Sequence, residues 1–180
     1  MPDPSRPPLP HDFLPPAPPL DVSSDDLADG KRLPETHVAD SMGATGDNIS
    51  PHLRWSDEPE GTQSFAVTCF DPDAPTGSGF WHWVVFDIPA DVHELPRGAG
   101  SGDMSELPSG ATHARNDTGA PGYLGAAPPP GHGEHRYVFT VYALGAPTLG
   151  VDESATPAYV GFNLTFNTLA RGSIVAVYDR

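Results

Sequence analysis

Runs of apolar residues along the chain predict strands more often than helices. Ser64–Phe70 (SFAVTCF) and His82–Ile88 (HWVVFDI) are rich in β-branched and aromatic residues, and Pro89 closes the second run. His135–Leu144 (HRYVFTVYAL) is the strongest run, since it is apolar on both alternating faces apart from three polar residues: His135, Arg136 and Thr140. A strand of this kind is covered on both sides.

Shorter strands and one helix complete the pattern. Asp21–Val22 and Leu53–Trp55 are candidates for short strands. Helical periodicity occurs near the C-terminus, where spacings of three, four and three define one apolar face made of Tyr159, Phe162, Phe166 and Leu169. Thr156-Pro157 predicts the start of this helix, and Gly172 predicts its end. Ile174–Tyr178 (IVAVY) predicts a terminal strand.

The length of 180 residues predicts one domain, and the elements make it mostly β. Nine of the first twenty residues are proline, with almost no apolar periodicity. We therefore expect residues 1–19 to be a disordered or polyproline-like tail and residues 20–180 to form the domain. A long segment, Arg97–Pro130, holds few apolar residues, and loops of that length are uncommon unless they are functional or disordered.

The net charge of the chain limits the classes of partner that it can bind. Lys and Arg number 9 against 24 Asp and Glu, which gives a net charge of -15. An acidic surface repels phosphate backbones and anionic headgroups, so we expect no nucleic-acid partner and no general adhesion to acidic membranes. A local cationic pocket for one small anion remains compatible with this charge.

Cysteine content and hydropathy point to a cytoplasmic protein. Cys69 is the only cysteine, which excludes an intrachain disulfide and a thiolate zinc site. The sequence begins without a basic region followed by an apolar stretch, so no secretory signal is expected. No apolar run approaches the roughly 18 residues that a membrane span needs, so stable membrane insertion is not expected.

Polar residues gather at the predicted ends of three strands. Asp71 and Asp73 follow the first strand, His82 begins the second, and His135 with Tyr137 begins the third. If these strands are neighbours, their ends converge on one rim and both histidines face one cavity. Each residue alone has a structural explanation, because aspartates form turns and strand-end histidines bind loop carbonyls.

Several chemistries compete for this group of residues. Two histidines and a carboxylate can bind iron, and His132 with His135 would supply two ligands, but no metalloprotease spacing is present. For hydrolysis, the chain lacks a G-x-S-x-G elbow and Cys69 lies in mid-strand, although a His–Asp pair suits acid–base catalysis. Two imidazoles, a tyrosine hydroxyl and loop N–H groups would hold a phosphate or carboxylate, and this reading needs only the residue types present.

Two long motifs carry a family resemblance. "DPDAP" followed by "WHWVVFDIP", and later "APPPGHGEHRYVF", resemble the phosphatidylethanolamine-binding protein family, in its bacterial branch similar to Raf kinase inhibitor protein. Further stretches match that branch: "NISPHLRW" (Asn48–Trp55), "EGTQSFAV" (Glu60–Val67), "GYLGA" in Asn116–Ala126, and the C-terminal "PAYVGFNLTFNTLARGSIVAVY". The likeness covers the chain from about Leu20 to its end.

The resemblance implies a fold and a pocket. The fold is a large antiparallel sheet packed on a smaller one, with one or a few peripheral helices. The pocket binds phosphate, acetate or phosphoethanolamine-like groups, through residues that correspond here to Asp71, Asp73, Pro75, His82, Pro129, His135 and Tyr137. Asp71 would orient His82, Gly133 would let the backbone approach the anion, and the peptide before Pro75 is often cis.

The chain also departs from the family pattern. Ala126 and Ala127 stand where the bacterial branch usually has a cysteine, and Thr36–Asp47 differs from the commoner form. Both departures leave the anion pocket in place but change the surroundings of a ligand.

The sequence therefore predicts a non-enzymatic protein that binds a small anion, without a metal or cofactor. The alternative is an enzyme that uses the same Asp, His and Tyr side chains for acid–base or cyclisation chemistry on a small molecule. A homodimer is expected from the bacterial relatives.

Overall fold

The computed structural model describes residues 6–180, which form two antiparallel sheets with two short helices and one 3-10 turn. Five strands pair in the order β6-β4-β3-β7-β8, and three pair in the order β1-β2-β5. The elements in chain order are α1 (Pro10–Phe13), β1 (Asp21–Ser23), η1 (Glu35–His37), β2 (Leu53–Ser56), β3 (Ser64–Asp71), β4 (Phe80–Pro89), β5 (Glu94–Leu95), β6 (Thr112–His113), β7 (His135–Leu144), α2 (Pro157–Asn167) and β8 (Thr168–Tyr178). The predicted fold class, mostly β with a large sheet packed on a smaller one, is confirmed.

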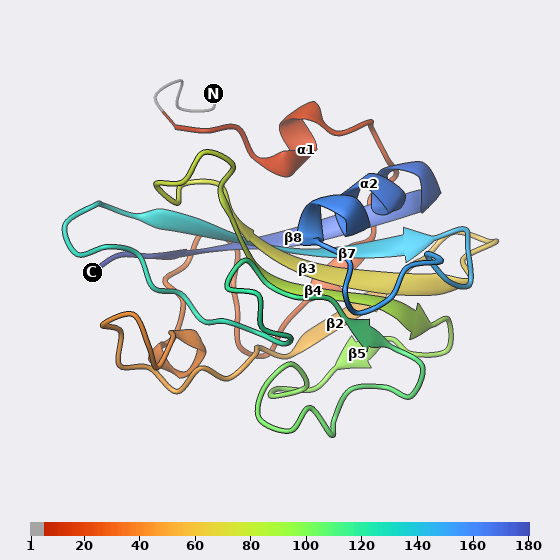
Figure 1. Cartoon of the computed structure of the whole chain (residues 1–180). Helices are drawn as coiled ribbons and strands as arrows, with labels where there is room; N and C mark the ends of the chain where they lie inside the picture. Colours follow the sequence, from red (N-terminus) through yellow and green to blue (C-terminus); the bar gives the residue numbers. More distant parts are fainter. Residues whose placement is uncertain (1–5) are drawn as a thin grey trace.

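The five-stranded sheet is buried on both faces, which explains why its central strands carry apolar residues on both alternating faces. Its inner face packs on the small sheet, where Phe65, Trp83 and Phe139 contact a core that includes Trp55. Its outer face carries α2 and α1, as Figure 1 shows, and forms a second core around Val84. Because side chains alternate along a strand, each central strand contributes to both cores.

Helix α2 begins where predicted but presents the opposite face to the protein. The Thr156 side chain caps the helix by accepting a hydrogen bond from the backbone N–H of Tyr159, and Pro157 occupies the first turn. The predicted apolar face was wrong, because the side chains of Tyr159, Phe162 and Phe166 are 54%, 58% and 73% exposed. The buried face consists of Pro157, Val160 and Leu164, which pack on the sheet.

The end of α2 also differs from the prediction. The helix ends at Asn167, five residues before Gly172, and β8 starts directly at Thr168. Gly172 instead lies inside β8, where a Cβ atom would come within 2.1 Å of the Leu20 carbonyl oxygen. The glycine is thus required by a close approach of two backbones and does not stop a helix.

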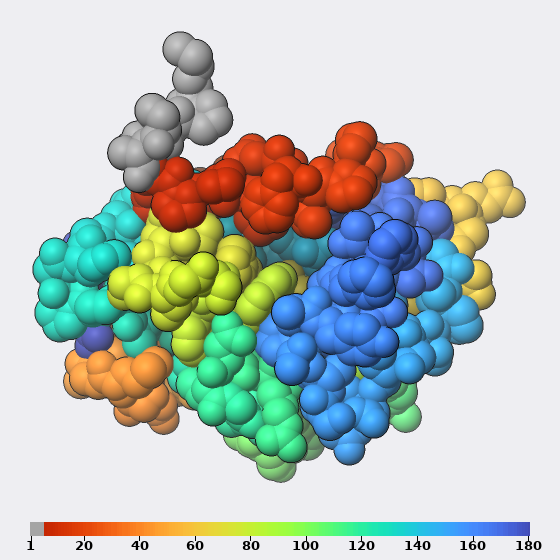
Figure 2. Space-filling view, turned by 45° about the horizontal axis from the view of Figure 1, so that its top comes forward, coloured from red at the N-terminus to blue at the C-terminus, as the bar shows by residue number. Residues whose placement is uncertain are grey.

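Residues 6–19 lie against the domain, whereas the sequence predicts a disordered tail. Arg6 pairs with Asp73 at one end of this segment, and backbone hydrogen bonds join Pro18 and Leu20 to Arg171 at the other end. Figure 2 shows the segment in red along the loop before β4 (yellow-green) and α2 (blue). Residues 1–5 of the predicted tail lie outside the described residues.

The long segment Arg97–Pro130 gains its order from the body of the protein. It contributes β6 at the edge of the large sheet, and Ala99, Ala114 and Tyr123 are buried. None of the helices within residues 6–180 has the length and hydropathy required to cross a membrane.

Candidate functional site

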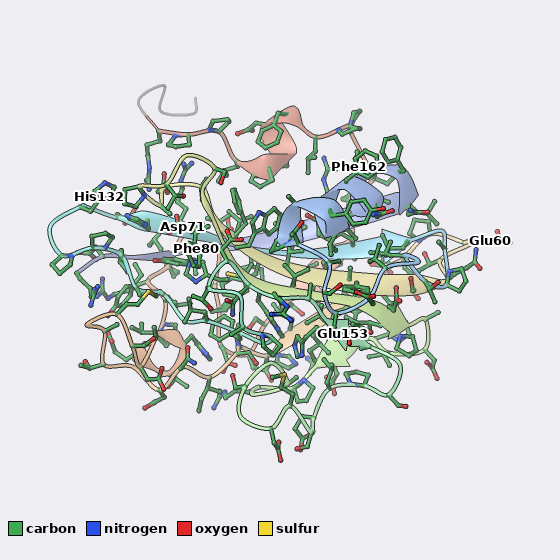
Figure 3. All side chains as sticks on the ribbon, viewed as in Figure 1. Glu60, Asp71, Phe80, His132, Glu153 and Phe162 are labelled. Atoms are coloured by element: carbon green, nitrogen blue, oxygen red, sulfur yellow. The ribbon has the colours of Figure 1, made fainter. Side chains whose placement is uncertain are left out.

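The strand order brings the predicted site residues to one rim of the large sheet. Strand β3 ends at Asp71, and both neighbours run antiparallel to it, so β4 and β7 begin beside that end. His82 on β4 and His135 and Tyr137 on β7 therefore lie close to Asp71. Figure 3 shows Asp71, Phe80 and His132 at this same end of the molecule.

A cavity of about 120 Å³ opens at this rim. It is lined by two proline turns and the inner side chains of three strands, namely Met42, Asp71, Ala74, Pro75, Thr76, Phe80, His82, Ala127, Pro128, Pro129, His135 and Tyr137. The polar groups point into a space whose walls are apolar, which is the usual composition of a small-molecule site.

Asp71 is held by a buried pair with His135. Its Oδ2 lies 2.7 Å from the Nδ1 of His135, and its Oδ1 accepts a hydrogen bond of 2.8 Å from the backbone N–H of Asp73. Both side chains are almost completely buried. The resemblance implied that Asp71 orients His82. This expectation is corrected, because the side chain that hydrogen-bonds to Asp71 is His135 on β7.

His82 is fixed by the loop that follows β6. Its Nδ1 lies 2.9 Å from the carbonyl oxygen of Leu124, so it donates to that oxygen, and Nε2 accepts in the neutral ring. Burial lowers the pKa of His82, although the negative charge of Asp71 and the carbonyl act in the opposite direction. The ring becomes a second donor only when it is protonated, which requires an acidic solution or a bound anion.

His132 caps His135 on the side away from Asp71. The Nδ1 of His132 lies 2.8 Å from the Nε2 of His135. Because His135 donates through Nδ1 to Asp71, its neutral ring accepts from His132 at Nε2. Gly131 and Gly133, which flank the exposed His132, have positive φ of 76° and 95°, so the turn depends on glycine at both positions.

The Tyr137 hydroxyl is buried without a protein partner. The residue is 1% exposed, and among residues 6–180 its oxygen makes no hydrogen bond. Burial, with the nearby charge of Asp71, raises the pKa of Tyr137 well above its ordinary value, so the hydroxyl keeps its proton. Buried polar groups almost always have a partner, so a donor of this kind indicates a place for a ligand atom.

Two predicted site residues, Asp73 and Gly133, do not line the cavity. The carboxylate of Asp73 turns outward, where Arg136 binds it at 2.8 Å and Arg6 binds it at 2.8 Å. Burial alone would raise the pKa of Asp73, but the hydrogen bonds from the two arginines outweigh burial and lower it. Asp73 thus holds residues 6–7 and the start of β7 together through the two arginines. Gly133 lies in the turn that leads into His135.

Sequence reasoning missed several residues of the site. Phe80 lies against His82, with ring centroids 4.9 Å apart. Its position at the start of β4, beside the predicted site, could have indicated this role in the sequence. Arg180 lies near the C-terminal end of the chain and donates to the Pro128 carbonyl at 2.7 Å, which braces the proline turn. No local motif points to a residue that is 52 positions away from its partner.

The described residues contain no group of three or more side chains suited to hold a metal ion. No peptide bond within residues 6–180 is cis, so the Ala74-Pro75 peptide differs from the family expectation. Cys69 is buried in β3, and burial raises the pKa of its thiol well above the ordinary value, which makes it unreactive.

Comparison with known proteins places the chain in a family. Residues 23–179 match the family described as phosphatidylethanolamine-binding protein. The UPF0098 protein YbhB of Escherichia coli is 57% identical over 160 residues, which cover 89% of this chain and 100% of that protein. The chain belongs to the phosphatidylethanolamine-binding protein family, a family of ligand-binding proteins.

Solved structures agree with this assignment. The crystal structure of E. coli YbcL, described as a member of the mammalian PEBP family, superposes with a TM-score of 0.87 at 47% identity and covers 89% of this chain and 98% of that chain. A PEBP homologue from Chlamydia trachomatis superposes with a TM-score of 0.74 at 25% identity, over 91% of this chain and 99% of that one.

Proposed function

We propose that the protein binds a small anion, such as phosphate, acetate or a phosphoethanolamine-like headgroup, in the cavity at the end of β3, β4 and β7. The observation that carries this proposal is the Tyr137 hydroxyl, which is buried and has no partner within residues 6–180. An anion oxygen in the cavity would accept its proton and remove the cost of leaving a buried donor unpaired.

The two histidines supply the remaining donors. A bound anion favours protonation of His82, whose Nε2 then becomes a donor, and it competes with His132 for the Nε2 of His135. The Asp71 carboxylate lies 2.7 Å from the other ring nitrogen of His135 and holds the ring in place. Charge-assisted hydrogen bonds of this kind are the strong ones.

The apolar wall limits what is attached to the anion. Phe80, Pro75 and Pro129 line the cavity beside the imidazoles. At about 120 Å³ the cavity holds a headgroup with few additional atoms, so any longer chain of the ligand must extend out between the proline turns.

An enzyme is the second candidate, because the Asp71–His135 pair also has the geometry of a general base with its orienting carboxylate. Incubation with a metabolite extract, followed by mass spectrometry, separates the two functions. Retention of an intact ligand supports binding, whereas loss of a metabolite with the appearance of its product supports catalysis.

Replacing Tyr137 by phenylalanine is expected to weaken anion binding without destabilising the fold. Within residues 6–180 the hydroxyl has no hydrogen-bond partner to lose, so the free energy of unfolding should stay the same or rise by up to about 1 kcal/mol. Loss of one donor should reduce the affinity for sulfate roughly threefold to tenfold. Calorimetric titration and urea unfolding measure the two quantities, and sulfate is used because its charge is constant with pH in the working range.

Tyr123→Phe is the matched control for this substitution. The Tyr123 hydroxyl donates to the His37 carbonyl at 2.7 Å, so its removal should cost stability by about 1 kcal/mol and leave sulfate affinity unchanged. If Tyr137→Phe binds sulfate as tightly as the wild type, the hydroxyl does not face the ligand and the proposal fails.

We also propose that the protein forms a homodimer through the exposed aromatic face of α2. On this helix Tyr159 stacks on Phe162, and Phe162 meets Phe166 edge-on. The helix contains no charged residue, although the chain carries a net charge of -15. A second copy would meet little like-charge repulsion on this face.

Phe166→Lys is expected to shift the protein to a monomer in light scattering, because it places a charge in the centre of the interface. Glu106→Lys, in the exposed loop between β5 and β6, changes the charge in the same direction and should leave the mass unchanged. A wild-type protein that is monomeric at high concentration would exclude the dimer.

A cytoplasmic location is proposed on the basis of cysteine usage, because the single Cys69 leaves no intrachain disulfide. Fractionation of the native host, with the protein found in the periplasmic or secreted fraction, would reject this location.

A further inference from the structure

A second cavity lies on the opposite face of the large sheet. It has a volume of about 250 Å³ and lies between the outer face, residues 10–17 and α2. Phe70, Trp81 and Tyr142 form its floor, whereas their neighbours Asp71, His82 and Tyr137 point to the anion cavity. The sheet separates the two cavities, so a ligand in one does not contact the other.

Residues 10–17 form the roof of this outer cavity. Phe13 and Leu14 line it together with Pro10, Pro15 and Pro16, and proline has no backbone N–H to donate. The threonine hydroxyl groups of the wall are already used, since Thr165 and Thr168 donate to helix carbonyls at 2.9 Å and 2.6 Å. The interior of the cavity is therefore apolar.

One cation borders this apolar space. Arg171 lines the cavity, and within residues 6–180 its guanidinium group forms neither a hydrogen bond nor an ion pair with a side chain. Its backbone, in contrast, bonds to residues that directly follow the roof, at 3.1 Å to Pro18 and 3.0 Å to Leu20. Among the described residues Arg171 shares this lack of an acidic partner with Arg115 and Arg180, and its position at the cavity lets it meet an anionic group.

We infer that the outer cavity is a binding site for an amphiphile with one anionic head and a medium-length apolar chain, of the medium-chain carboxylate class. The chain would lie between Phe13, Trp81 and Leu164, and the head would reach Arg171. The volume is below the roughly 300–1,000 Å³ of sites for drug-sized ligands, which favours a short chain over a two-chain lipid. This site is separate from the proposed anion site.

Calorimetric titration of sodium decanoate into the full chain tests the inference. The expected result is binding of one decanoate per chain that saturating phosphate does not weaken, because the two cavities lie on opposite faces. Competition by phosphate would place the carboxylate in the anion cavity, and absence of binding would remove the site altogether. Either result overturns the inference.

Gly161→Leu fills the cavity without disturbing the fold. Gly161 lines the cavity on α2, and a Cβ atom at this position meets nothing within 4 Å, so leucine is accommodated and also favours a helix. Decanoate affinity should fall at least about tenfold, since the chain and the new side chain compete for one space. Gly161→Ala is the matched control and should bind within about twofold of the wild type. Equal binding to the leucine variant would contradict the inference.

Arg171→Gln tests the position of the head. Decanoate affinity should fall by at most about fivefold, because the guanidinium is partly exposed, while the affinity for uncharged decanol should not change. Arg54→Gln removes an arginine from the small sheet and should affect neither probe. If the affinities for decanoate and decanol fall equally in Arg171→Gln, the substitution acts by disturbing the roof of the cavity, and the assignment of the head to Arg171 is wrong.

Discussion

Replacing His135 by alanine is expected to weaken sulfate binding roughly tenfold or more and to destabilise the protein by about 3–5 kcal/mol at neutral pH. His135 is the only side chain among residues 6–180 that donates to the buried carboxylate of Asp71, at 2.7 Å. Without it the carboxylate retains one donor, the backbone N–H of Asp73, and stays in a buried site with an uncompensated charge. The loss of a charge-assisted donor should reduce sulfate affinity by about 1.5–3 kcal/mol, or roughly tenfold or more.

A double-mutant cycle separates the pair from its surroundings. Asp71→Asn alone, His135→Ala alone and the double variant are compared by urea unfolding. The double variant should be more stable than the sum of the single effects predicts, because it removes the carboxylate together with its partner. Additive effects would show that the two residues are not coupled and that the buried pair does not hold the site together.

Arg54→Ala serves as a control for unspecific effects, because its pair with Glu94 is exposed and 3.3 Å long. Exposed pairs contribute about 0–1 kcal/mol, so its loss should change neither unfolding nor sulfate binding by a comparable amount. A similar loss in both variants would mean that the His135 effect does not come from burial.

The sequence predicted the three central strands of the large sheet and the rim where Asp71, His82 and His135 meet. β3, β4 and β7 are recognisable in the sequence because strands buried on both faces are apolar on both alternating faces. Convergence of Asp71, His82 and His135 followed from placing the three strands side by side, which the structure has in the order β4-β3-β7.

The partner of Asp71 could not be read from the sequence. The ladder between β3 and β4 shifts by one residue between Cys69 and Phe70, which leaves His82 without a partner on β3 and places Asp71 opposite Phe80. On the other side, β7 starts early enough for His135 to reach the carboxylate. A bulge of one residue leaves no mark in a pattern of apolar residues, so the side-chain pairing was decided by geometry that only the fold contains.

The face of α2 was ambiguous for a similar reason. Both Val160 with Leu164 and Phe162 with Phe166 have helical spacing, and the larger aromatic residues gave the stronger pattern. The structure buries the aliphatic pair, because the helix ends at Asn167 and turns directly into β8. Residues 6–19 were unpredictable in the same sense, since the partners of Arg6 and Pro18 lie more than sixty positions away.

Buried histidines should make the protein lose stability as the pH falls from about 6.5 to about 4.5. His113 accepts a hydrogen bond of 3.0 Å from the indole N–H of Trp83, so protonation of the same nitrogen would break this bond. Burial lowers the pKa of His113 to about 4. Burial also lowers the pKa of His37 and His82, with nearby carbonyls and carboxylates opposing the shift in both.

The sign of the effect follows from proton binding. A histidine whose pKa is lower in the folded state binds fewer protons there than in the unfolded chain, whose value is about 6.5. Its stabilising contribution is complete above that pH and is lost as the pH falls toward the folded value. The lowered pKa values of Asp26 and Asp73 act in a different window, because those contributions are lost only below the unfolded value of about 4.

His113 alone should reduce the free energy of unfolding by about 2.5 kcal/mol between neutral pH and about pH 4.5, since one pKa unit corresponds to about 1.4 kcal/mol. Urea unfolding at the two pH values measures the loss. His113→Gln keeps an acceptor for the Trp83 N–H and cannot be protonated, so its loss over the same range should be smaller by about that amount. His11→Gln, which replaces an exposed ring on α1, should behave as the wild type. The same pH dependence in His113→Gln and the wild type would show that the acid sensitivity has another origin.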